Sequence, residues 1–352
     1  MRAAVYHGAG DIRVEDVSDP SPAPGELLLE IHAAGICGTD VGEYLHGPVS
    51  YAAEGLVPGH EFSGRVAALG KDVNGFEVGA VVASGAGISC GECFQCRAGR
   101  TNLCLFYSTI GLHRDGALAQ YVAVPAATCI DVGPHGLDEE TAALSQPMAI
   151  AVHSMRRGRP APGEEVAVIG AGGIGAFLTY AAARAGARVT VVDLLPERLE
   201  LALALGAADA ISPREDATLE ELFGDRGVEP SVIYEVTGLP GVLDEAADAL
   251  VPGGRLVVVG LQANPLEVDL RRLTLTEVEW IGTNAHVCDV DLPDAIRLLA
   301  ARESRWTDVA PTMLPLTELV SDGIQPMADG KSTRIKTLID PWAENTRERQ
   351  ER

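Results

Sequence analysis

The chain has 352 residues, of which 47% are hydrophobic and 39 are glycine, a composition typical of a globular α/β protein with room for about two domains. Its formal net charge of −23 argues against binding to nucleic acid phosphates and against docking on an anionic membrane surface. The N-terminus has no charged segment followed by an apolar one, and no run approaches the ~18 apolar residues needed to cross a membrane. We therefore expect a cytoplasmic protein without a nucleic acid or membrane partner.

The first part of the chain predicts short strands. Apolar segments at 26–34, 62–69 and 121–124 are separated by Gly, Pro and Asp turns. A long helical periodicity first follows Ala142. The Pro/Gly- and charge-rich segment 157–165 then marks a change in the pattern.

From residue 165 onward, predicted strands and helices alternate, which indicates a parallel sheet covered by helices. Strands are expected at 166–170, 189–193, 231–236, 255–260 and 278–282, and helices at 174–185, 196–205, 242–250 and 292–301. The polar C-terminal sequence PWAENTRERQER predicts a loose tail.

Four of the seven cysteines lie close together, in the sequence CGECFQCRAGRTNLC. Four thiolates with the spacing C-x2-C-x2-C-x7-C can surround one tetrahedral Zn²⁺ and leave no ligand position open, which is typical of a structural site. In a reducing cytosol such clustering indicates metal binding rather than disulfides. We expect a structural zinc bound by Cys90, Cys93, Cys96 and Cys104.

The sequence GAGGIG follows a predicted strand and opens a predicted helix, the context in which G-x-G-x-x-G indicates dinucleotide binding. Gly170 permits a tight turn, Gly172 lets the backbone approach a pyrophosphate, and Gly175 lets the helix pack on the strand. Gly173 and Ile174 complete the loop. The helix N-terminus then offers free N–H groups to the phosphates.

Asp193 ends the next predicted strand, 18 residues after Gly175. A carboxylate in this place can accept hydrogen bonds from the adenosine ribose, whereas a 2′-phosphate would meet a like charge. NAD is therefore the expected cofactor. Arg198 keeps NADP open as the alternative, because a nearby arginine can accommodate that phosphate.

A second candidate metal site precedes the cysteine cluster. ICGTD contains Cys37, Thr39 and Asp40, and PGHEFSG contains His60 and Glu61. Thiolate, imidazole and carboxylate are all ligands of zinc, and three protein ligands with an open fourth position suit catalysis. We expect Cys37, His60 and Glu61 to hold zinc, Thr39 to pass the alcohol proton outward, and Asp40 to accept the far N–H of His60. Taken singly, the three ligands also fit a buried cysteine, a loop histidine and a surface carboxylate.

The motifs CGTD and GHEFSG, the four-cysteine segment, GAGGIG and Asp193 stand in the order found in the zinc-containing medium-chain dehydrogenase/reductase family, which the chain resembles over nearly its whole length. The segments ICGTDVGEYLHGPVS, VPGHEFSG and QPMAIAVHSMRRG most resemble the (R,R)-butanediol and polyol dehydrogenase branch. The resemblance implies reversible NAD(H)-linked oxidation of a secondary alcohol (a vicinal diol, polyol or cyclitol) by a homodimer or homotetramer. It also implies a catalytic and a structural zinc in each chain.

The same resemblance implies an α/β fold with a GroES-like, β-rich catalytic domain, a Rossmann domain with a doubly wound parallel sheet, and an active site in the cleft between them. We assign residues 1–152 to the catalytic domain, with a structural zinc lobe at about 85–108. Residues 153–290 are assigned to the Rossmann domain, and residues 291–352 to a segment that returns to the catalytic domain.

The ends of later predicted strands extend the expected cofactor site. One loop resembles the segment that flanks the adenine side in this family, although a plain strand-end turn explains it equally. At two further strand ends, backbone groups could hold the nicotinamide carboxamide. The residues expected there are Val236, Thr237, Val259, Gly260, Thr283 and Asn284.

Two residues depart from the pattern of the family branch. Gln146 stands where the branch has a glutamate that binds zinc or its water, and a neutral amide is a weaker ligand that cannot act as a base. Gly42 stands where the branch carries a histidine, which interrupts a proton relay from Thr39 through the cofactor ribose. His46 is a possible substitute, although the favoured interpretation is an ordinary loop histidine.

Two alternatives to a polyol or butanediol dehydrogenase follow from these departures. One is a specialised dehydrogenase for a cyclic polyol or another biosynthetic intermediate, with a site altered by Gln146. The other is a non-catalytic NAD-binding protein, against which the presence of Cys37, Thr39, His60 and Glu61 argues.

Overall fold

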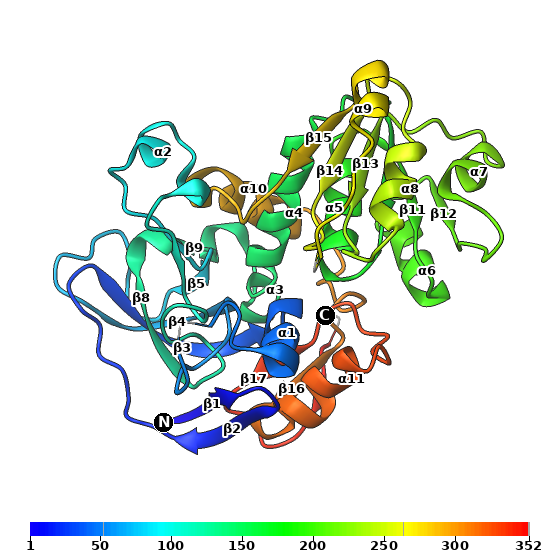
Figure 1. Ribbon diagram of the computed structural model, residues 1–352. Helices are drawn as coiled ribbons and strands as arrows, with labels where there is room; N and C mark the ends of the chain where they lie inside the picture. Colours follow the sequence, from blue (N-terminus) through cyan, green and yellow to red (C-terminus); the bar gives the residue numbers. More distant parts are fainter. Residues whose placement is uncertain (52, 263, 351–352) are drawn as a thin grey trace. The chain divides into compact units, whose positions relative to one another are not determined.

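The computed structural model describes residues 1–51, 53–262 and 264–350 (Figure 1). The chain forms two compact units. Unit 1 is built from two stretches, Met1–Ala149 and His286–Arg352, and unit 2 from the continuous stretch Ile150–Ala285. The boundary between Ala149 and Ile150 falls inside one helix, α4 (Ser145–Gly158).

Unit 1 is centred on a mixed sheet in the order β18-β16-β17-β3-β4-β5-β9, with β8 also paired to β3. Strand β3 alternates fully and partly buried residues, so that Leu27, Leu29 and Ile31 enter the core while the residues between them face outward. The strands are β3 (Glu26–Gly35), β4 (Glu61–Leu69), β5 (Val81–Ser84), β8 (Tyr121–Pro125), β9 (Cys129–Asp131), β16 (Thr312–Pro315), β17 (Leu338–Asp340) and β18 (Arg347–Glu348).

Smaller elements complete unit 1. An antiparallel hairpin joins β1 (Arg2–Gly8) to β2 (Asp11–Asp16), and a second pair joins β6 (Gly87–Ile88) to β7 (Ser108–Thr109). The helices are α1 (Gly38–His46), α2 (Phe94–Arg97), α3 (Glu139–Ala142), α10 (Cys288–Ala300) and α11 (Gln325–Ala328), with short helical turns η1 (Thr101–Leu103), η2 (Ala126–Thr128), η3 (Gly133–His135), η4 (Leu316–Glu318) and η5 (Leu319–Ile324).

Unit 2 is a six-stranded parallel sheet in the order β12-β11-β10-β13-β14-β15. Its strands are β10 (Glu165–Ile169), β11 (Arg188–Val192), β12 (Asp209–Ile211), β13 (Val232–Glu235), β14 (Arg255–Val258) and β15 (Glu279–Gly282). Its helices are α5 (Gly173–Arg184), α6 (Pro196–Ala204), α7 (Leu219–Gly224), α8 (Val242–Asp248) and α9 (Leu270–Thr276). Continuous apolar runs such as VAVI bury these strands on both faces, as parallel sheets require.

The predicted parallel sheet is confirmed, as is the α/β fold with a β-rich unit and a Rossmann-type unit. The predicted strands lie within a residue or so of the observed ones at β3, β4 and β8. The sequence analysis did not anticipate the hairpin β1–β2 or the helices α1, α7 and α9. These short elements carry too few periodic positions to stand out from loops.

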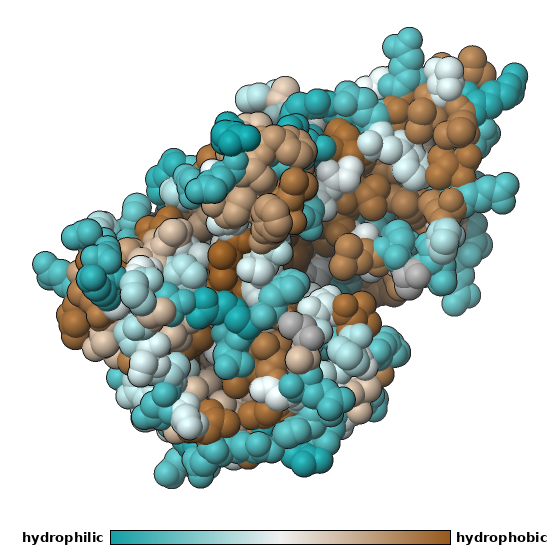
Figure 2. Space-filling model, turned by 60° about the vertical axis from the view of Figure 1, so that its left-hand side comes forward, coloured by the Kyte–Doolittle hydropathy of each residue, from teal (hydrophilic) through white to brown (hydrophobic). Residues whose placement is uncertain are grey.

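Apolar side chains reach the surface in several places. On the face drawn in Figure 2, hydrophobic residues are interspersed with polar ones. Four large apolar side chains are exposed around the cysteine cluster, namely Phe94, Leu103, Leu105 and Phe106. Within the part of the chain that the structure describes, no helix combines the length and the apolar character needed to cross a bilayer.

The expectation of a loose C-terminal tail is wrong. Residues Arg347–Glu348 form β18, which pairs antiparallel with β16 at the edge of the unit 1 sheet. The next residue, Arg349, is buried, and its backbone N–H donates to Pro311 O at 2.7 Å. A polar composition indicates solvation only when the charged groups find no partners in the fold, and here they find several.

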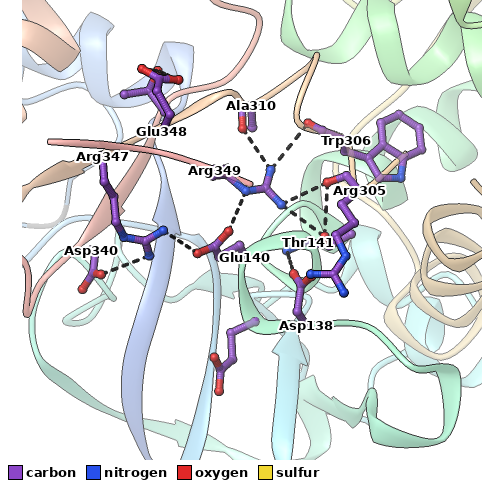
Figure 3. Close-up of polar contacts among 12 residues, drawn as sticks. Asp138, Glu140, Thr141, Arg305, Trp306, Ala310, Asp340, Arg347, Glu348 and Arg349 are labelled. Carbon is purple, nitrogen blue, oxygen red and sulfur yellow. Dashed lines mark hydrogen bonds and ion pairs between the residues drawn. The ribbon is translucent and has the colours of Figure 1, made fainter. Parts of the chain in front are cut away.

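The Arg349 guanidinium lies in a set of acceptors from two segments, α3 and the loop before β16 (Figure 3). Its Nε donates to Glu140 Oε2 at 2.9 Å, and its two terminal nitrogens donate to Ala310 O at 2.9 Å and to Arg305 O at 3.0 Å. Thr141 Oγ1 accepts a further bond at 3.2 Å. The same Glu140 pairs with Arg347 through its other oxygen at 2.7 Å. The C-terminal segment is therefore fastened to α3 and to the loop before β16.

Replacing Arg349 with methionine should lower the free energy of unfolding by about 3–5 kcal/mol, because the buried acceptors lose their charged donor. Arg347→Met is the matched control, since it removes the other arginine on Glu140 from a side chain that is 43% exposed. Urea denaturation followed by circular dichroism measures both. Equal losses in the two variants would contradict a special role of the buried guanidinium.

Candidate active site and nucleotide site

The register of three strands brings the candidate metal ligands of unit 1 together. In the sheet, Gly35 of β3 stands opposite Glu61 of β4 on one side and opposite Leu338 of β17 on the other. Cys37 follows β3 directly, and His60 immediately precedes β4. Because the strands are antiparallel, the end of β3 and the start of β4 meet at the same place.

Gly35 is required by this packing. A Cβ atom at this position would lie 2.5 Å from Glu61 Oε2, a distance that real Cβ contacts do not reach. The glycine therefore leaves room for the Glu61 carboxylate beside β3. A side chain at position 35 would displace the carboxylate or separate the strands.

The ligand atoms of Cys37, His60 and Glu61 all lie within 4.8 Å of one another, a set compact enough for one ion. His60 and Glu61 are buried, and Cys37 is partly exposed. The Cys37 Sγ is 3.7 Å from Thr39 Oγ1. The chemistry of this donor set fits zinc with an open position, since it supplies one thiolate, one imidazole and one carboxylate.

Asp40 supports the candidate metal site by accepting hydrogen bonds from neighbouring groups. Cys37 is the N-cap of α1, and its backbone N–H donates to Asp40 Oδ2 at 2.8 Å. The other carboxylate oxygen accepts a hydrogen bond from the Tyr51 hydroxyl at 2.8 Å and lies 3.9 Å from His60 Nδ1. The distance to His60 is longer than a hydrogen bond, so the expected acceptance of the His60 N–H by Asp40 is not formed in this structure. No spacing in the sequence pointed to Tyr51 as the partner of Asp40.

Lys336 is the main site residue that sequence reasoning missed. It lies just before β17, and it is only 5% exposed. Its ammonium group forms an ion pair with Glu61 Oε2 and donates to Ile36 O at 3.0 Å. The Ile36 backbone N–H in turn donates to Thr337 O at 3.0 Å. The only sequence signal was a charged residue at the start of an apolar run.

The charges of the site shift the pKa values of its bases. Burial lowers the pKa of His60, but Cys37, Asp40 and Glu61 outweigh it and raise that pKa to about 10 when protein groups alone surround the ring. Burial likewise lowers the pKa of Lys336, and the same acidic groups, Glu61 first, raise it above its usual value. The acidic groups of the site outnumber the basic ones, and a divalent cation would neutralise the excess negative charge.

The two departures from the family pattern have different surroundings. Gln146 is buried in the first turn of α4. Gly42 lies within α1, where a Cβ would meet no described atom within 4 Å, so a larger side chain has room there. His46 is exposed at the C-terminal end of α1.

The four cysteines of the second cluster also converge. All four Sγ atoms lie within 4.8 Å of one another, and the Cys93–Cys96, Cys90–Cys96 and Cys93–Cys104 sulfur distances are 3.5, 3.9 and 3.9 Å. Four sulfurs at about 2.3 Å from a zinc ion stand about 3.8 Å apart at the corners of a tetrahedron. The cluster thus has the dimensions of a closed zinc site.

Backbone amides prepare the cluster for thiolates. The Cys90 N–H donates to Cys104 Sγ and the Cys93 N–H donates to Cys90 Sγ, each at 3.3 Å. Hydrogen bonds from backbone groups lower the pKa of Cys93 to about 6, whereas burial and neighbouring thiols raise the pKa of Cys96 to about 12. A metal ion is needed to deprotonate the whole set.

In unit 2, the glycine loop stands between β10 and α5 as the motif requires. Gly170 has a φ of +96°, which favours glycine, and a Cβ on Gly175 would lie 1.8 Å from Gly170 O. Gly172 caps α5 without a side-chain hydrogen bond, and Gly173 and Ile174 form the first turn of this helix. The N–H groups of that turn are therefore available to an anion.

Asp193 follows β11 and holds the loop in place. Its Oδ2 accepts a hydrogen bond from the Ala171 N–H at 2.7 Å, and its Oδ1 accepts one from the Leu195 N–H at 2.9 Å. Arg198, in α6, places its Nη1 3.7 Å from Asp193 Oδ2. The acidic residue and the arginine that favour different cofactors are thus direct neighbours.

The remaining expected cofactor residues all lie at carboxyl ends of unit 2 strands. Val236 and Thr237 follow β13, Val259 and Gly260 follow β14, and Thr283 and Asn284 follow β15. A Cβ on Gly170 would lie 2.7 Å from Thr237 Cγ2, so the loops after β10 and β13 are in contact. Ligands of open α/β sheets bind at this edge.

Comparison with known proteins decides the family. Residues 23–134 match the alcohol dehydrogenase GroES-like domain, and residues 173–301 match the zinc-binding dehydrogenase domain. The chain is 36% identical over 292 residues to sorbitol dehydrogenase of Bacillus subtilis strain 168, a match that covers 80% of this chain and 81% of the relative. The chain belongs to the zinc-containing medium-chain dehydrogenase/reductase family.

Solved structures place this dehydrogenase near the polyol and butanediol branch of the family. The crystal structure of 2R,3R-butanediol dehydrogenase from Bacillus subtilis is similar, with a TM-score of 0.87 and 28% identity over 97% of this chain and 99% of that chain. The structure of short chain alcohol dehydrogenase (RspB) from Escherichia coli CFT073, in complex with NADH, has the same TM-score and coverage with 27% identity. The dehydrogenase is thus an alcohol-type oxidoreductase of a family that uses zinc and nicotinamide cofactors.

Replacing Lys336 with methionine should destabilise the metal-free dehydrogenase by about 3–5 kcal/mol, because the Glu61 carboxylate is left buried without its partner. Urea denaturation of chelator-treated protein measures the loss. Lys331→Met is the control, since Lys331 pairs with Asp329 on the surface and its side chain is 76% exposed. A Lys336 variant as stable as the control would show that Glu61 does not depend on the lysine.

Proposed function

We propose that this chain oxidises a secondary alcohol to its ketone, reversibly, with zinc and NAD, and that its substrate is a vicinal diol, polyol or cyclitol. The observation that carries the proposal is the convergence of Cys37, His60 and Glu61 on one point beside Thr39. Three residues that each have a separate structural explanation are assembled into one donor set, with the Thr39 hydroxyl next to it. This assembly favours an enzyme over a non-catalytic scaffold.

In the proposed mechanism, Cys37, His60 and Glu61 hold the catalytic zinc. A zinc ion in this place supplies Lewis acidity, which makes the substrate hydroxyl more acidic and favours departure of hydride from its carbon. Asp40 holds the N-terminus of α1, and with it Cys37, through the Cys37 N–H. Lys336 fixes the Glu61 carboxylate by its ion pair.

Thr39 is the proposed first proton acceptor, because its hydroxyl lies beside Cys37 and can both accept and donate. Gly42 offers no side chain to continue the relay, and His46 at the end of α1 is exposed. We therefore propose that the proton passes from Thr39 to the cofactor ribose or to water.

The cofactor is proposed to bind on unit 2, with its pyrophosphate at the N-terminus of α5 and its adenosine ribose near Asp193. Asp193 supports NAD, because its carboxylate would repel a 2′-phosphate. Arg198, 3.7 Å away, is already neutralised by that carboxylate. Val236, Thr237, Val259, Gly260, Thr283 and Asn284 are the proposed contacts with the rest of the cofactor, and a homodimer or homotetramer is the proposed assembly.

The relatives support the substrate class. The sorbitol and butanediol relatives favour a diol or polyol. The buried amide of Gln146 favours a second candidate, a specialised dehydrogenase for a cyclic polyol or other biosynthetic intermediate. A neutral group in place of a carboxylate changes the charge around the metal and the hydrogen bonds offered to a substrate. Initial rates of NADH formation with butanediol, sorbitol and cyclitols distinguish the two candidates.

The decisive test is zinc content together with activity. Wild-type protein should retain about two zinc ions per chain after a brief EDTA wash, one in each cysteine-containing site. Cys37→Ser should retain about one and lose about a thousandfold or more in kcat/KM. Cys93→Ser, the matched control, should also lose one zinc and unfold more easily, but its residual folded fraction should turn over. A wild-type chain with one zinc and no activity would refute the catalytic assignment.

Gln146→Glu should increase the affinity of the catalytic site for zinc about tenfold, because it restores a carboxylate next to the proposed metal. Competition with a chromophoric chelator measures the affinity. Gln350→Glu adds the same charge at an exposed position and should leave the affinity unchanged. Unchanged affinity in the Gln146 variant would place that side chain away from the metal.

A further inference from the structure

Glu235 is a fully buried acidic residue at the carboxyl end of β13. Its Oε1 accepts hydrogen bonds from the Thr237 N–H at 2.6 Å, the Thr237 hydroxyl at 2.5 Å and the Gly238 N–H at 3.0 Å. Its Oε2 accepts one from Gln262 Nε2 at 3.3 Å. Among the described residues it forms no ion pair, so neutral donors alone stabilise this carboxylate.

Glu235 stands where the order of the parallel sheet reverses. From the centre of the sheet, the strand order proceeds outward through β10, β11 and β12 on one side and through β13, β14 and β15 on the other. Strands β10 and β13 are therefore the central neighbours. In such sheets a crevice opens outside the carboxyl ends of these two strands, and ligands bind there. The last residue of β10 pairs with Glu235, as Ile169↔Glu235.

Three loops meet around Glu235, and two of them are hydrogen-bonded to its carboxylate. The loop after β13 is bonded to Glu235 Oε1, and Gln262 from the loop after β14 is bonded to Oε2. The backbone N–H groups of Val259 and Gly260 both donate to Glu235 O at 2.9 Å. The loop after β10 contacts Thr237, which is bonded to the carboxylate, because a Cβ on Gly170 would lie 2.7 Å from Thr237 Cγ2.

The loops after β13 and β14 pack so closely around the carboxylate that a side chain has no room at Gly238 or Gly260. A Cβ on Gly260 would lie 2.2 Å from Gly238 N and 2.9 Å from Glu235 Oε2. A Cβ on Gly238 would lie 2.7 Å from Leu261 O. The loops after β13 and β14 therefore pack backbone to backbone, and the carboxylate is the polar link between them.

We propose that Glu235 is a positioning residue for the dinucleotide: it sets the relative placement of the three loops that border the cofactor crevice without contacting the cofactor itself. The inference rests on the proposed function, since it assumes that the crevice binds NAD. A buried carboxylate stabilises a fold poorly compared with an apolar side chain of similar size, because it must be desolvated. Its contribution is instead the geometry that its fixed acceptors impose on Thr237, Gly238 and Gln262.

The test measures NADH affinity of the zinc-loaded protein by the change in NADH fluorescence, together with the melting temperature. Glu235→Gln turns one acceptor oxygen into a donor, so two donors face each other at Gln262 or at Thr237. Gln262→Glu places two carboxylates opposite each other. Each single variant should weaken NADH binding about tenfold.

The double variant Glu235→Gln with Gln262→Glu restores a donor opposite an acceptor and should recover most of the affinity. Glu229→Gln, an exposed carboxylate of the same unit, is the control and should bind NADH like the wild type. Gln262→Glu changes only a partly exposed side chain and keeps the test valid if Glu235→Gln fails to fold. Recovery of NADH affinity in the double variant would show that the pair of Glu235 and Gln262 determines this affinity.

Two results would overturn the inference. If the wild type binds NADH and the single variants melt at lower temperature but bind it equally well, Glu235 is structural only. If both single variants weaken binding and the double variant shows no recovery, the link to Gln262 is wrong. A wild type that binds neither NADH nor NADPH would refute the proposed cofactor itself, and this inference with it.

Discussion

The candidate metal site depends on the space left by the missing side chain of Gly35. At that position β3 is flanked by β4 and β17, and the absent Cβ leaves the room that the Glu61 carboxylate occupies. The register fixed there sets Cys37 beside Glu61 and brings Lys336 against Ile36. Ligands and counter-charge are thus positioned by backbone pairing, and their geometry is as rigid as the sheet that carries them.

Much of the site was predictable because its chemistry is encoded in short spacings. The cysteine cluster, the glycine loop and the pairs Cys37–Asp40 and His60–Glu61 each fit within one or two elements. Lys336 and Arg349 were not predictable in this way. Both are charged residues in a polar or mixed segment. Their burial depends on partners that lie 39 to 300 residues earlier in the chain, which local composition does not report.

The nucleotide unit shows a related division. The strand–loop–helix order predicted the position of Gly170 and Asp193, but not that the Asp193 carboxylate accepts hydrogen bonds from the backbone at Ala171 and Leu195. This residue thus stabilises the turn, in addition to its proposed role in excluding a 2′-phosphate. Glu235 went unnoticed because a lone glutamate after a strand has no signature, whereas its role appears only when three loops are seen to meet. Both carboxylates accept hydrogen bonds from backbone N–H groups, and their proposed effects on the cofactor come in addition to these bonds.

The division of the chain into one continuous and one interrupted unit has a consequence for biosynthesis. Unit 2, Ile150–Ala285, is complete before the second stretch of unit 1 leaves the ribosome. Cys37, His60 and Glu61 are made early, but Lys336, which offsets the charge of Glu61, is made near the end. The nucleotide fold can therefore form on the nascent chain, whereas the candidate metal site reaches its final charge balance only after the last strands have joined the sheet.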